Sequence, residues 1–236
     1  MKKIGKWLWQ DLKETNSTND SVLDFLKEVK APCIVSAEIQ TGGRGRLGRV
    51  WEGESGNLFA SFAYEIETQS LTHYALLSGL AVLDTINFFV PAQDVKVKWP
   101  NDVFVEGKKI SGILFEKGFG NYWVMGIGIN VAHTPKVENP MYAITSLADF
   151  NVKVKREDVL KKLVENFDIL KKEYETHGFE KIRLRWLDNA YNRGKKVIIK
   201  QNKQEYEGVF ENIGANGELI LRTKEGVQNI LAGDLY

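Results

Sequence analysis

Residues 95–131 hold a succession of short strand-type segments separated by brief turns, and this feature limits the possible folds most. Segments 95–99, 103–105 and 110–116 are rich in β-branched and apolar residues, and a Glu-Gly-Lys turn separates the last two. A further apolar run follows at 122–131. Because turns this short join strands as antiparallel neighbours, the segment predicts an antiparallel sheet.

Apolar residues at helical spacing flank this sheet, which predicts an α+β fold. The predicted helices cover residues 19–29, 75–88, 159–170 and 179–191, and further strands are expected at 33–40 and 57–65. Beyond residue 194 the pattern changes to strands at 197–200, 206–211 and 218–222, punctuated by glycines. We therefore expect an α/β domain at residues 1–190 and a small β barrel at 191–236.

Composition excludes several classes of protein. The 32 basic and 31 acidic residues nearly cancel, so no overall field favours nucleic acid or anionic lipid. Cys33 is the single cysteine, which excludes an internal disulfide and a thiolate zinc cluster. No apolar run reaches the roughly 18 residues of a membrane span, so we expect a cytoplasmic chain with no membrane contact. His73, His133 and His177 are too scattered to indicate a catalytic triad or a zinc site.

Residues 41–56 hold six glycines and three arginines, and scarcely any apolar residue. The segment formally contains G-x-G-x-x-G, but no helix start follows it, so the dinucleotide-binding interpretation fails. A Walker A loop fails too, because Arg49 and Val50 stand where Lys and Ser or Thr are needed. What remains is a mobile loop whose guanidinium groups can wrap an anionic ligand. A solvated loop with weak RNA contact is the alternative.

Two further segments place polar groups at strand ends. In Lys98-Trp-Pro-Asn-Asp the proline forces extended or turn geometry, so that Asn101 and Asp102 supply an amide and a carboxylate. Lys109 precedes an alternating strand in which Gly112 lets another group approach the backbone closely. Taken singly, the first segment is also an ordinary β-turn, and the second a hairpin with a charged turn.

Gly126 and Gly128 lie on one face of a predicted strand and leave room for a flat ligand, which core packing alone rarely requires. Asn130 ends that strand. Upstream, Ser-Thr-Asn at residues 17–19 precedes the first predicted helix, and helix capping accounts for these residues without any ligand.

Taken in order, these motifs resemble the biotin protein ligases, also called biotin–[acetyl-CoA-carboxylase] ligases. The series is Ser-Thr-Asn, a glutamine before Gly-Arg-Gly-Arg-x-Gly-Arg-x-Trp, Lys-Trp-Pro-Asn-Asp, Lys-x-x-Gly-Ile and Gly-Ile-Gly-Ile-Asn, and it extends from about residue 14. The resemblance implies a class II aminoacyl-tRNA synthetase-like catalytic domain followed by an SH3-like barrel. It is closest to the short type without an N-terminal winged-helix domain, for which no DNA binding is expected.

The resemblance also implies residue roles. The biotin site would comprise Ser17, Thr18, Asn19, Gln40, Gly43, Arg44, Gly45, Arg46, Lys109, Gly112, Gly126 and Gly128. The ATP site would comprise Arg46, Arg49, Trp51, Lys98, Asn101, Lys109 and Asn130. Catalysis would rest on Lys109, Arg44, Arg46 and Asp102, with Asp102 either a Mg²⁺ ligand or the base near the incoming lysine. Residues 132–145 would cover the adenine. Leu47 stands where many relatives carry a basic residue, which would weaken phosphate contact.

The implied reaction converts biotin and MgATP into biotinyl-5′-AMP, with biotin binding first, and then transfers biotin to a lysine of a biotin carboxyl carrier protein of acetyl-CoA carboxylase or a related carboxylase. Many relatives pair as homodimers, so the oligomeric state stays open. A lipoate or octanoate ligase shares the adenylation chemistry and is the first alternative. A non-catalytic nucleic-acid-binding module is the second, and the near-zero net charge argues against it.

Overall fold

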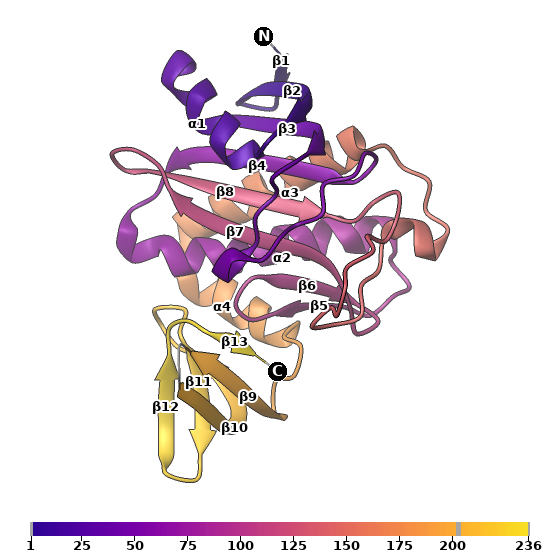
Figure 1. Ribbon diagram of the computed structural model, residues 1–236. Helices are drawn as coiled ribbons and strands as arrows, with labels where there is room; N and C mark the ends of the chain where they lie inside the picture. The colour runs from indigo at the N-terminus through magenta and orange to yellow at the C-terminus, as the bar shows by residue number, and fades with distance from the viewer. Residues whose placement is uncertain (1, 202–203, 236) are drawn as a thin grey trace.

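The computed structural model describes residues 2–201 and 204–235, and within them the larger part of the chain is built on an eight-stranded sheet (Figure 1). The strand order is β1-β2-β3-β4-β8-β7-β6-β5. The strands are β1 (Lys2–Ile4), β2 (Trp7–Thr15), β3 (Cys33–Gln40), β4 (Leu58–Glu65), β5 (Val95–Lys98), β6 (Asp102–Val105), β7 (Lys108–Lys117) and β8 (Tyr122–Ile129). Residues 1, 202–203 and 236, which the two predicted domains include, lie outside the described part.

The connections decide the strand directions. The helix α1 (Thr18–Val29) returns the chain from the end of β2 to the start of β3, so these two strands pair in parallel. From β5 to β8 the connections are short, and each consecutive pair is antiparallel. Between β6 and β7, Glu106 and Gly107 have φ angles of 50° and 71°, the positive values that a tight hairpin turn requires. The predicted antiparallel sheet is therefore confirmed.

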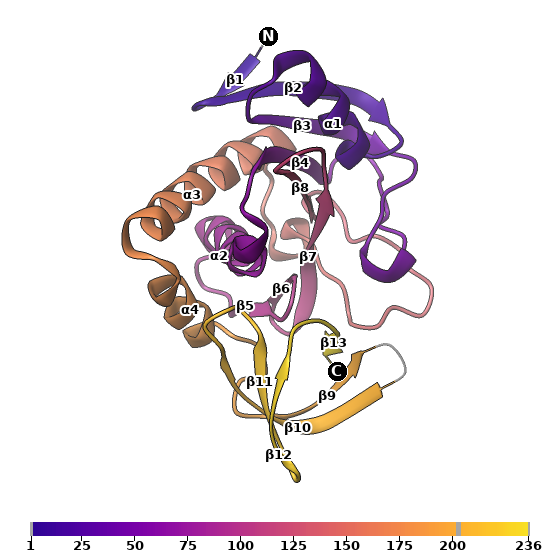
Figure 2. The same ribbon diagram turned by 90° about the vertical axis from the view of Figure 1, so that its left-hand side faces the viewer.

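Helices cover the two faces of the sheet unequally. Figure 2 shows α2 (Leu71–Phe89) and α3 (Arg156–His177) on one side of the sheet and α1 on the other. Strand β3 shows the division, because Ile34 packs in the main core whereas Cys33 and Val35 pack under α1. Burial raises the pKa of the Cys33 thiol to about 12, so it acts as a small hydrophobic side chain.

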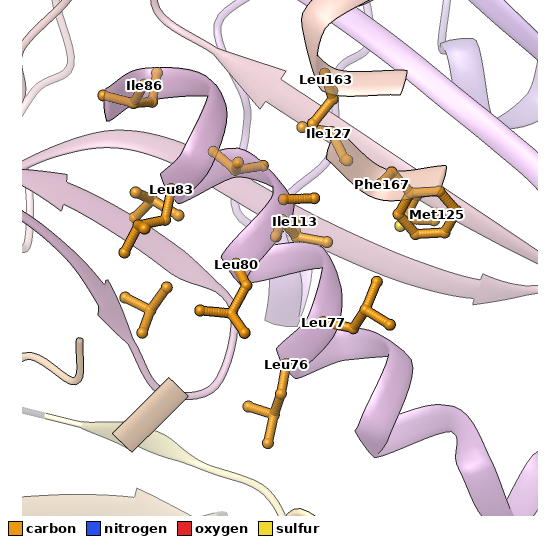
Figure 3. Packing of buried hydrophobic residues seen from close by; sticks show 14 of the residues in the cluster. Leu76, Leu77, Leu80, Leu83, Ile86, Ile113, Met125, Ile127, Leu163 and Phe167 are labelled. Carbon is orange, nitrogen blue, oxygen red and sulfur yellow. The ribbon is translucent and has the colours of Figure 1, made fainter. Parts of the chain in front are cut away.

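The main core lies between α2, α3 and strands β7 and β8. Figure 3 shows the α2 side chains reaching the sheet beside Phe167 and Leu163 of α3. The helix α2 is apolar around most of its circumference because it is enclosed by the sheet, α3 and α4 (Phe179–Asp188). The labelled members of this cluster are Leu76, Leu77, Leu80, Leu83, Ile86, Ile113, Met125, Ile127, Leu163 and Phe167.

A second, antiparallel sheet follows α4, with strand order β12-β11-β10-β9-β13. Its strands are β9 (Lys196–Gln201), β10 (Gln204–Ile213), β11 (Leu219–Thr223), β12 (Gly226–Ile230) and β13 (Asp234–Leu235). This small β domain docks on the helices: Arg183 Nη1 donates to the Ile213 carbonyl at 2.8 Å, and His73 Nε2 lies 2.9 Å from the Ala215 carbonyl oxygen. The domain division at 190/191 stays a prediction.

The predicted helices and strands correspond to observed ones, with differences at their ends. The helix predicted at 179–191 ends at Asp188, because the next residues pair with β5: the Val97 amide donates to Asn189 and the Tyr191 amide donates to Val97. The helix predicted at 75–88 begins earlier, at Leu71, directly after a 3-10 turn at Thr68–Ser70. Strands β1, β2, β12 and β13 were not predicted. β1 and β13 are only three and two residues long, and β2 carries polar residues through its second half.

Leu80 tests the packing of the core. Its side chain is fully buried, so Leu80→Ala is expected to lower the free energy of unfolding by about 2–5 kcal/mol through lost burial and a residual cavity. Urea denaturation followed by circular dichroism measures this. The matched control is Leu184→Ala on α4, where the leucine is 50% exposed and a change within about 0.5 kcal/mol is expected. Equal effects of the two substitutions would contradict the packing described.

Candidate active site

One pocket on the α1 side of the sheet collects most of the sequence motifs. Its volume is about 130 Å³, and its walls come from the start of α1, strands β7 and β8, the loop between β3 and β4, and β13. In Figure 1 that loop crosses in front of β8 and β7. The lining residues are Ser17–Asn19, Gln40, Arg44–Arg46, Arg49–Trp51, Phe59, Lys98–Asp102, Lys109, Gly112–Leu114, Gly126–Gly128, Met141, Tyr142, Asp234 and Leu235.

The floor of the pocket is a patch of sheet without side chains. Gly112 and Gly128 are directly paired across β7 and β8, and Gly126 lies on the same face two residues along. The Trp51 indole lies against this patch, so a Cβ atom at Gly128 would come within 2.3 Å of its ring. At Gly126 a Cβ would lie 2.3 Å from the Asn19 Oδ1 atom. The room predicted for a flat group is thus filled here by Trp51 and Asn19 of the chain itself.

A neutral hydrogen-bond network forms one end of the pocket. The Thr18 amide and hydroxyl both donate to Gln40 Oε1, at 2.8 and 2.9 Å. The Ser61 hydroxyl lies 2.7 Å from Thr18 Oγ1 and 2.6 Å from Asn19 Oδ1. Ser17 occupies the N-cap position, yet its side chain makes no capping hydrogen bond. Capping therefore does not account for these residues, whose side chains face the pocket instead.

The glycine-arginine loop, residues 41–56, is held by its own backbone. The Trp51 amide donates to the Gly43 carbonyl, and the Gln40 amide donates to Gly53. These approaches need glycine, because a Cβ atom at Gly43 would lie 2.3 Å from the Trp51 carbonyl oxygen and one at Gly53 only 2.0 Å from that of Gln40. Several glycines of this loop thus serve close backbone contact in addition to the flexibility predicted from composition.

Carboxylates of the chain pair with the three arginines of the loop. Arg44 contacts Asp20 at 2.7 Å and Glu116 at 3.1 Å. Its hydrogen bond lowers the pKa of Asp20. Arg46 donates to Asn101 Oδ1 at 3.0 Å and lies 3.8 Å from Asp234, which Arg49 also binds.

Two lysines complete the cationic end of the pocket. Lys109 Nζ lies 2.8 Å from Asp102 Oδ1. Lys98 Nζ donates to the Tyr142 hydroxyl at 2.8 Å and to the Leu235 carbonyl. Burial lowers the pKa of Lys98 to about 8, because the charged ammonium is poorly solvated there. The cations are thus concentrated where strands β5 and β6 meet the arginine loop and β13.

The structure brings nearly all predicted site residues together, and places two outside the pocket lining. Gly43 lies behind Gln40 and the Trp51 backbone. Asn130 is buried, and its amide donates to the Thr145 carbonyl at 2.9 Å, which fastens the loop that follows β8. The remaining predicted residues line the pocket: Ser17, Thr18, Asn19, Gln40, Arg44, Gly45, Arg46, Arg49, Trp51, Lys98, Asn101, Asp102, Lys109, Gly112, Gly126 and Gly128.

Sequence reasoning missed the acidic partners and Tyr142. Asp20 could have been included as a site residue, because it directly follows the Ser-Thr-Asn motif in the sequence. Asp234 gave no local signal, because 185 residues separate it from Arg49. Within residues 2–201 and 204–235, no group of three or more His, Cys, Asp or Glu side chains is arranged to hold a metal ion. No helix of the described part is long and apolar enough to cross a membrane.

Comparisons with known proteins identify the family of this chain. Residues 12–131 match the model of the biotin/lipoate A/B protein ligase family. The chain is 30% identical to biotin–[acetyl-CoA-carboxylase] ligase of Paracoccus denitrificans, over 95% of this chain and 98% of that protein. It is 32% identical to the bifunctional ligase/repressor BirA of Bacillus subtilis, over 86% of this chain and 65% of that protein. The chain belongs to the biotin/lipoate A/B protein ligase family.

The same family is found among solved structures. The biotin protein ligase of Aquifex aeolicus in complex with biotin and ATP superposes with a TM-score of 0.83 at 28% identity, covering 97% of both chains. The likeness thus includes the small β domain as well as the first sheet. The predicted fold class, a class II aminoacyl-tRNA synthetase-like α+β domain with an SH3-like barrel, is confirmed.

The low pKa of Lys98 predicts a pH dependence of stability. Between pH 8 and the ordinary lysine value, the unfolded chain holds a proton on Lys98 that the folded chain does not, so unfolding takes up a proton and stability rises with pH. The free energy of unfolding of the parent, relative to Lys98→Met, should increase by about 1.4 kcal/mol per pH unit in this range. Urea unfolding at about pH 7, 8.5 and 10 measures the difference. A difference that is independent of pH would contradict the assignment.

Proposed function

We propose that this chain is a biotin protein ligase, which activates biotin with ATP as biotinyl-5′-AMP and transfers the biotinyl group to a lysine of a carrier protein. The observation that carries the proposal is a single pocket with a neutral hydrogen-bonding end at Thr18, Asn19 and Gln40 and a cationic end at Arg46 and Lys109. Such a pocket suits a ligand with a polar uncharged head and a carboxylate that meets phosphate. The solved relative with biotin and ATP supports it.

The reaction needs no nucleophile from the enzyme. A biotin carboxylate oxygen attacks the α-phosphorus of ATP, a phosphorus–oxygen bond forms, and pyrophosphate leaves. The lysine amine of the carrier then attacks the carbonyl carbon of the mixed anhydride, AMP leaves and the amine gives up a proton. Because two anions must meet in the first step, fixed cations lower its barrier most. Lys109 and Arg46 are two such cations in the pocket lining, and they contact the adjacent residues Asp102 and Asn101.

The predicted residue roles fit this division of the pocket. At the neutral end, Ser17, Thr18, Asn19 and Gln40 would hold the biotin ring over Gly112, Gly126 and Gly128. At the cationic end, Arg46, Arg49, Lys98, Asn101 and Lys109 would hold the phosphates, and Trp51 would move from the glycine patch when ligand enters. For Gly43 and Asn130, which lie outside the lining, we propose support of the arginine loop and of residues 132–145.

Asp102 is the residue through which Mg²⁺ would act. Its Oδ1 atom is buried and lies 2.8 Å from the Lys109 ammonium, with no other polar contact. One carboxylate, together with phosphate oxygens of the nucleotide, is the ligand set that Mg²⁺ commonly takes in proteins. The ion would neutralise phosphate charge when bound. Because Asp102 lines the pocket, it would alternatively accept the proton of the incoming lysine, and both roles are proposals.

The proposed acceptor is the biotin carboxyl carrier protein of acetyl-CoA carboxylase or a related carboxylase, and the proposed location is the cytoplasm. The name of the Paracoccus denitrificans relative supports the acceptor. Homodimer formation is a further proposal. No described contact specifies these partners.

Mass spectrometry of the acyl-adenylate tests the proposed function. The purified chain is incubated with MgATP and either biotin or lipoate, without carrier. Biotinyl-AMP as the sole product is expected. Lipoyl-AMP as the sole product would assign the chain to the lipoate branch of its family, and the absence of both would contradict ligase activity.

Lys109→Ala is expected to slow adenylate formation by about 100-fold or more, because it removes a cation from the point where phosphate charge develops. The biotin dissociation constant should change far less. The neighbouring Lys108 is exposed, so Lys108→Ala is the matched control and should leave the rate unchanged. Stopped-flow measurement of adenylate formation checks both variants. A near-normal rate for Lys109→Ala would refute its role.

Arg46→Gly is expected to let biotinyl-AMP escape about tenfold faster, since a charged hydrogen-bonding group over the anhydride is lost. Leu47→Gly is the control, because it adds a glycine to the same loop and removes no charge. Leu47 is exposed and has a φ angle of 56°, a value that glycine adopts readily. Rates of adenylate release are measured by dilution into excess unlabelled biotin. Retention of the adenylate by Arg46→Gly would rule out a contact between Arg46 and the anhydride.

A further inference from the structure

Four oxygens of the small β domain lie among the cations of the pocket. Arg49 binds the Asp234 carboxylate and Arg46 lies 3.8 Å from it. Arg46 also donates to the Gly233 carbonyl at 3.2 Å, and Lys98 donates to the Leu235 carbonyl. A segment of three residues thus presents one carboxylate and two carbonyls to cations that the proposed function assigns to the nucleotide.

The arrangement resembles a guanidinium–phosphate contact. Both carboxylate oxygens of Asp234 face the Arg49 guanidinium, at 3.4 Å for the Oδ1–Nη1 pair, which is the forked geometry that arginine uses with phosphate. The Asp234 side chain is only 11% exposed and lies in the wall of the pocket. A phosphate entering this end of the pocket would meet the same cations.

The small β domain does not need this carboxylate to stay in place. The backbone of β13 is fixed by pairing with β9, in which Asp234 faces Lys200 and Leu235 faces Ile199. Docking on the helices is supplied elsewhere, by Arg183 with the Ile213 carbonyl and by His73 with the Ala215 carbonyl. The ion pairs of Asp234 therefore hold the arginine loop, and the domain stays docked through other contacts.

We propose that Asp234 is an internal competitor for the nucleotide phosphates, which keeps the cationic end of the pocket neutralised until ligand reorganises the arginine loop. This inference rests on the proposed function, since ATP is the polyphosphate in question. It gives a physical reason for ordered binding: in the biotin-free chain a polyphosphate must first break the Asp234 contacts with Arg46 and Arg49.

The neutral end of the pocket is linked to the same loop. Asn19 donates to Glu116 at 2.6 Å, and Glu116 binds Arg44. The backbones of Arg44 and Val50 form an isolated antiparallel β-bridge, and the Gly45 amide donates to the Arg49 carbonyl at 2.7 Å. A group that engages Asn19 therefore disturbs Arg44, and through the short hairpin it disturbs Arg49. Biotin at the neutral end would in this way release Asp234 before the nucleotide enters.

Calorimetric titration of the biotin-free chain with inorganic pyrophosphate tests the proposal. Asp234→Asn is expected to bind pyrophosphate about tenfold more tightly than the parent, the change that follows from losing one competing ion pair in a partly buried site. The matched control is Asp84→Asn, which removes an aspartate paired with Arg185 away from the pocket and should bind as the parent does. Unchanged or weaker binding by Asp234→Asn would overturn the proposal, because an aspartate that merely positions the arginines would help phosphate binding.

Hydrogen exchange on the unaltered chain decides the matter if Asp234→Asn does not fold. Pyrophosphate is expected to speed exchange of the amides at 233–235, since their side chains and carbonyls lose the cations. Slower or unchanged exchange would overturn the proposal. The biotinyl-AMP assay on the parent separates this outcome from failure of the proposed function. If the parent makes the adenylate but Asp234→Asn binds pyrophosphate no more tightly than the parent, only the proposed competition by Asp234 is refuted.

Discussion

The absence of side chains at three positions of the first sheet makes the site possible. Gly112, Gly126 and Gly128 lie together on one face of β7 and β8, while their neighbours on the opposite face build the main core. Strand alternation makes this separation possible: the apolar side chains at 113, 125 and 127 pack in the main core, on the face of the sheet opposite to the three glycines. Any Cβ at Gly128 would overlap the Trp51 ring. The floor of the pocket is therefore set by the sheet, and the loop supplies its cover.

Charge compensation is the second constraint on the pocket. Burying an unpaired cation is costly, so a ligand-free pocket rich in arginine and lysine must supply its own anions. Each arginine of the loop meets an anion, with Asp20 and Glu116 on Arg44 and Asp234 on both Arg46 and Arg49. Binding of an anionic ligand is then an exchange of ion pairs, and its affinity is the difference between two sets of contacts.

The sequence predicted what is local and missed what is distant. The antiparallel strands, the four helices and the glycine pair at 126 and 128 follow from periodicity and turn residues, which act over a few positions. The site motifs could be ordered along the chain and matched to a family, so nearly all of the proposed ligand residues line one pocket. What could not be found is pairing across the fold: Glu116 on Arg44 or Asp234 on Arg49 carries no pattern near either partner. The expected loop at 41–56 is held by such contacts, which composition does not reveal.

The small β domain is attached at two places with different physical character. Near the N-terminus of α2 and on α4 it makes hydrogen bonds between side chains and carbonyls, such as His73 with Ala215 and Arg183 with Ile213, that no ligand of the pocket would touch. At β13 it makes ion pairs with groups that the ligand also needs. The first attachment keeps the domain docked while the second is exchanged. A domain that contributes few residues to the pocket can thus control which anion occupies it, because its own carboxylate and the ligand cannot hold the same arginines at once.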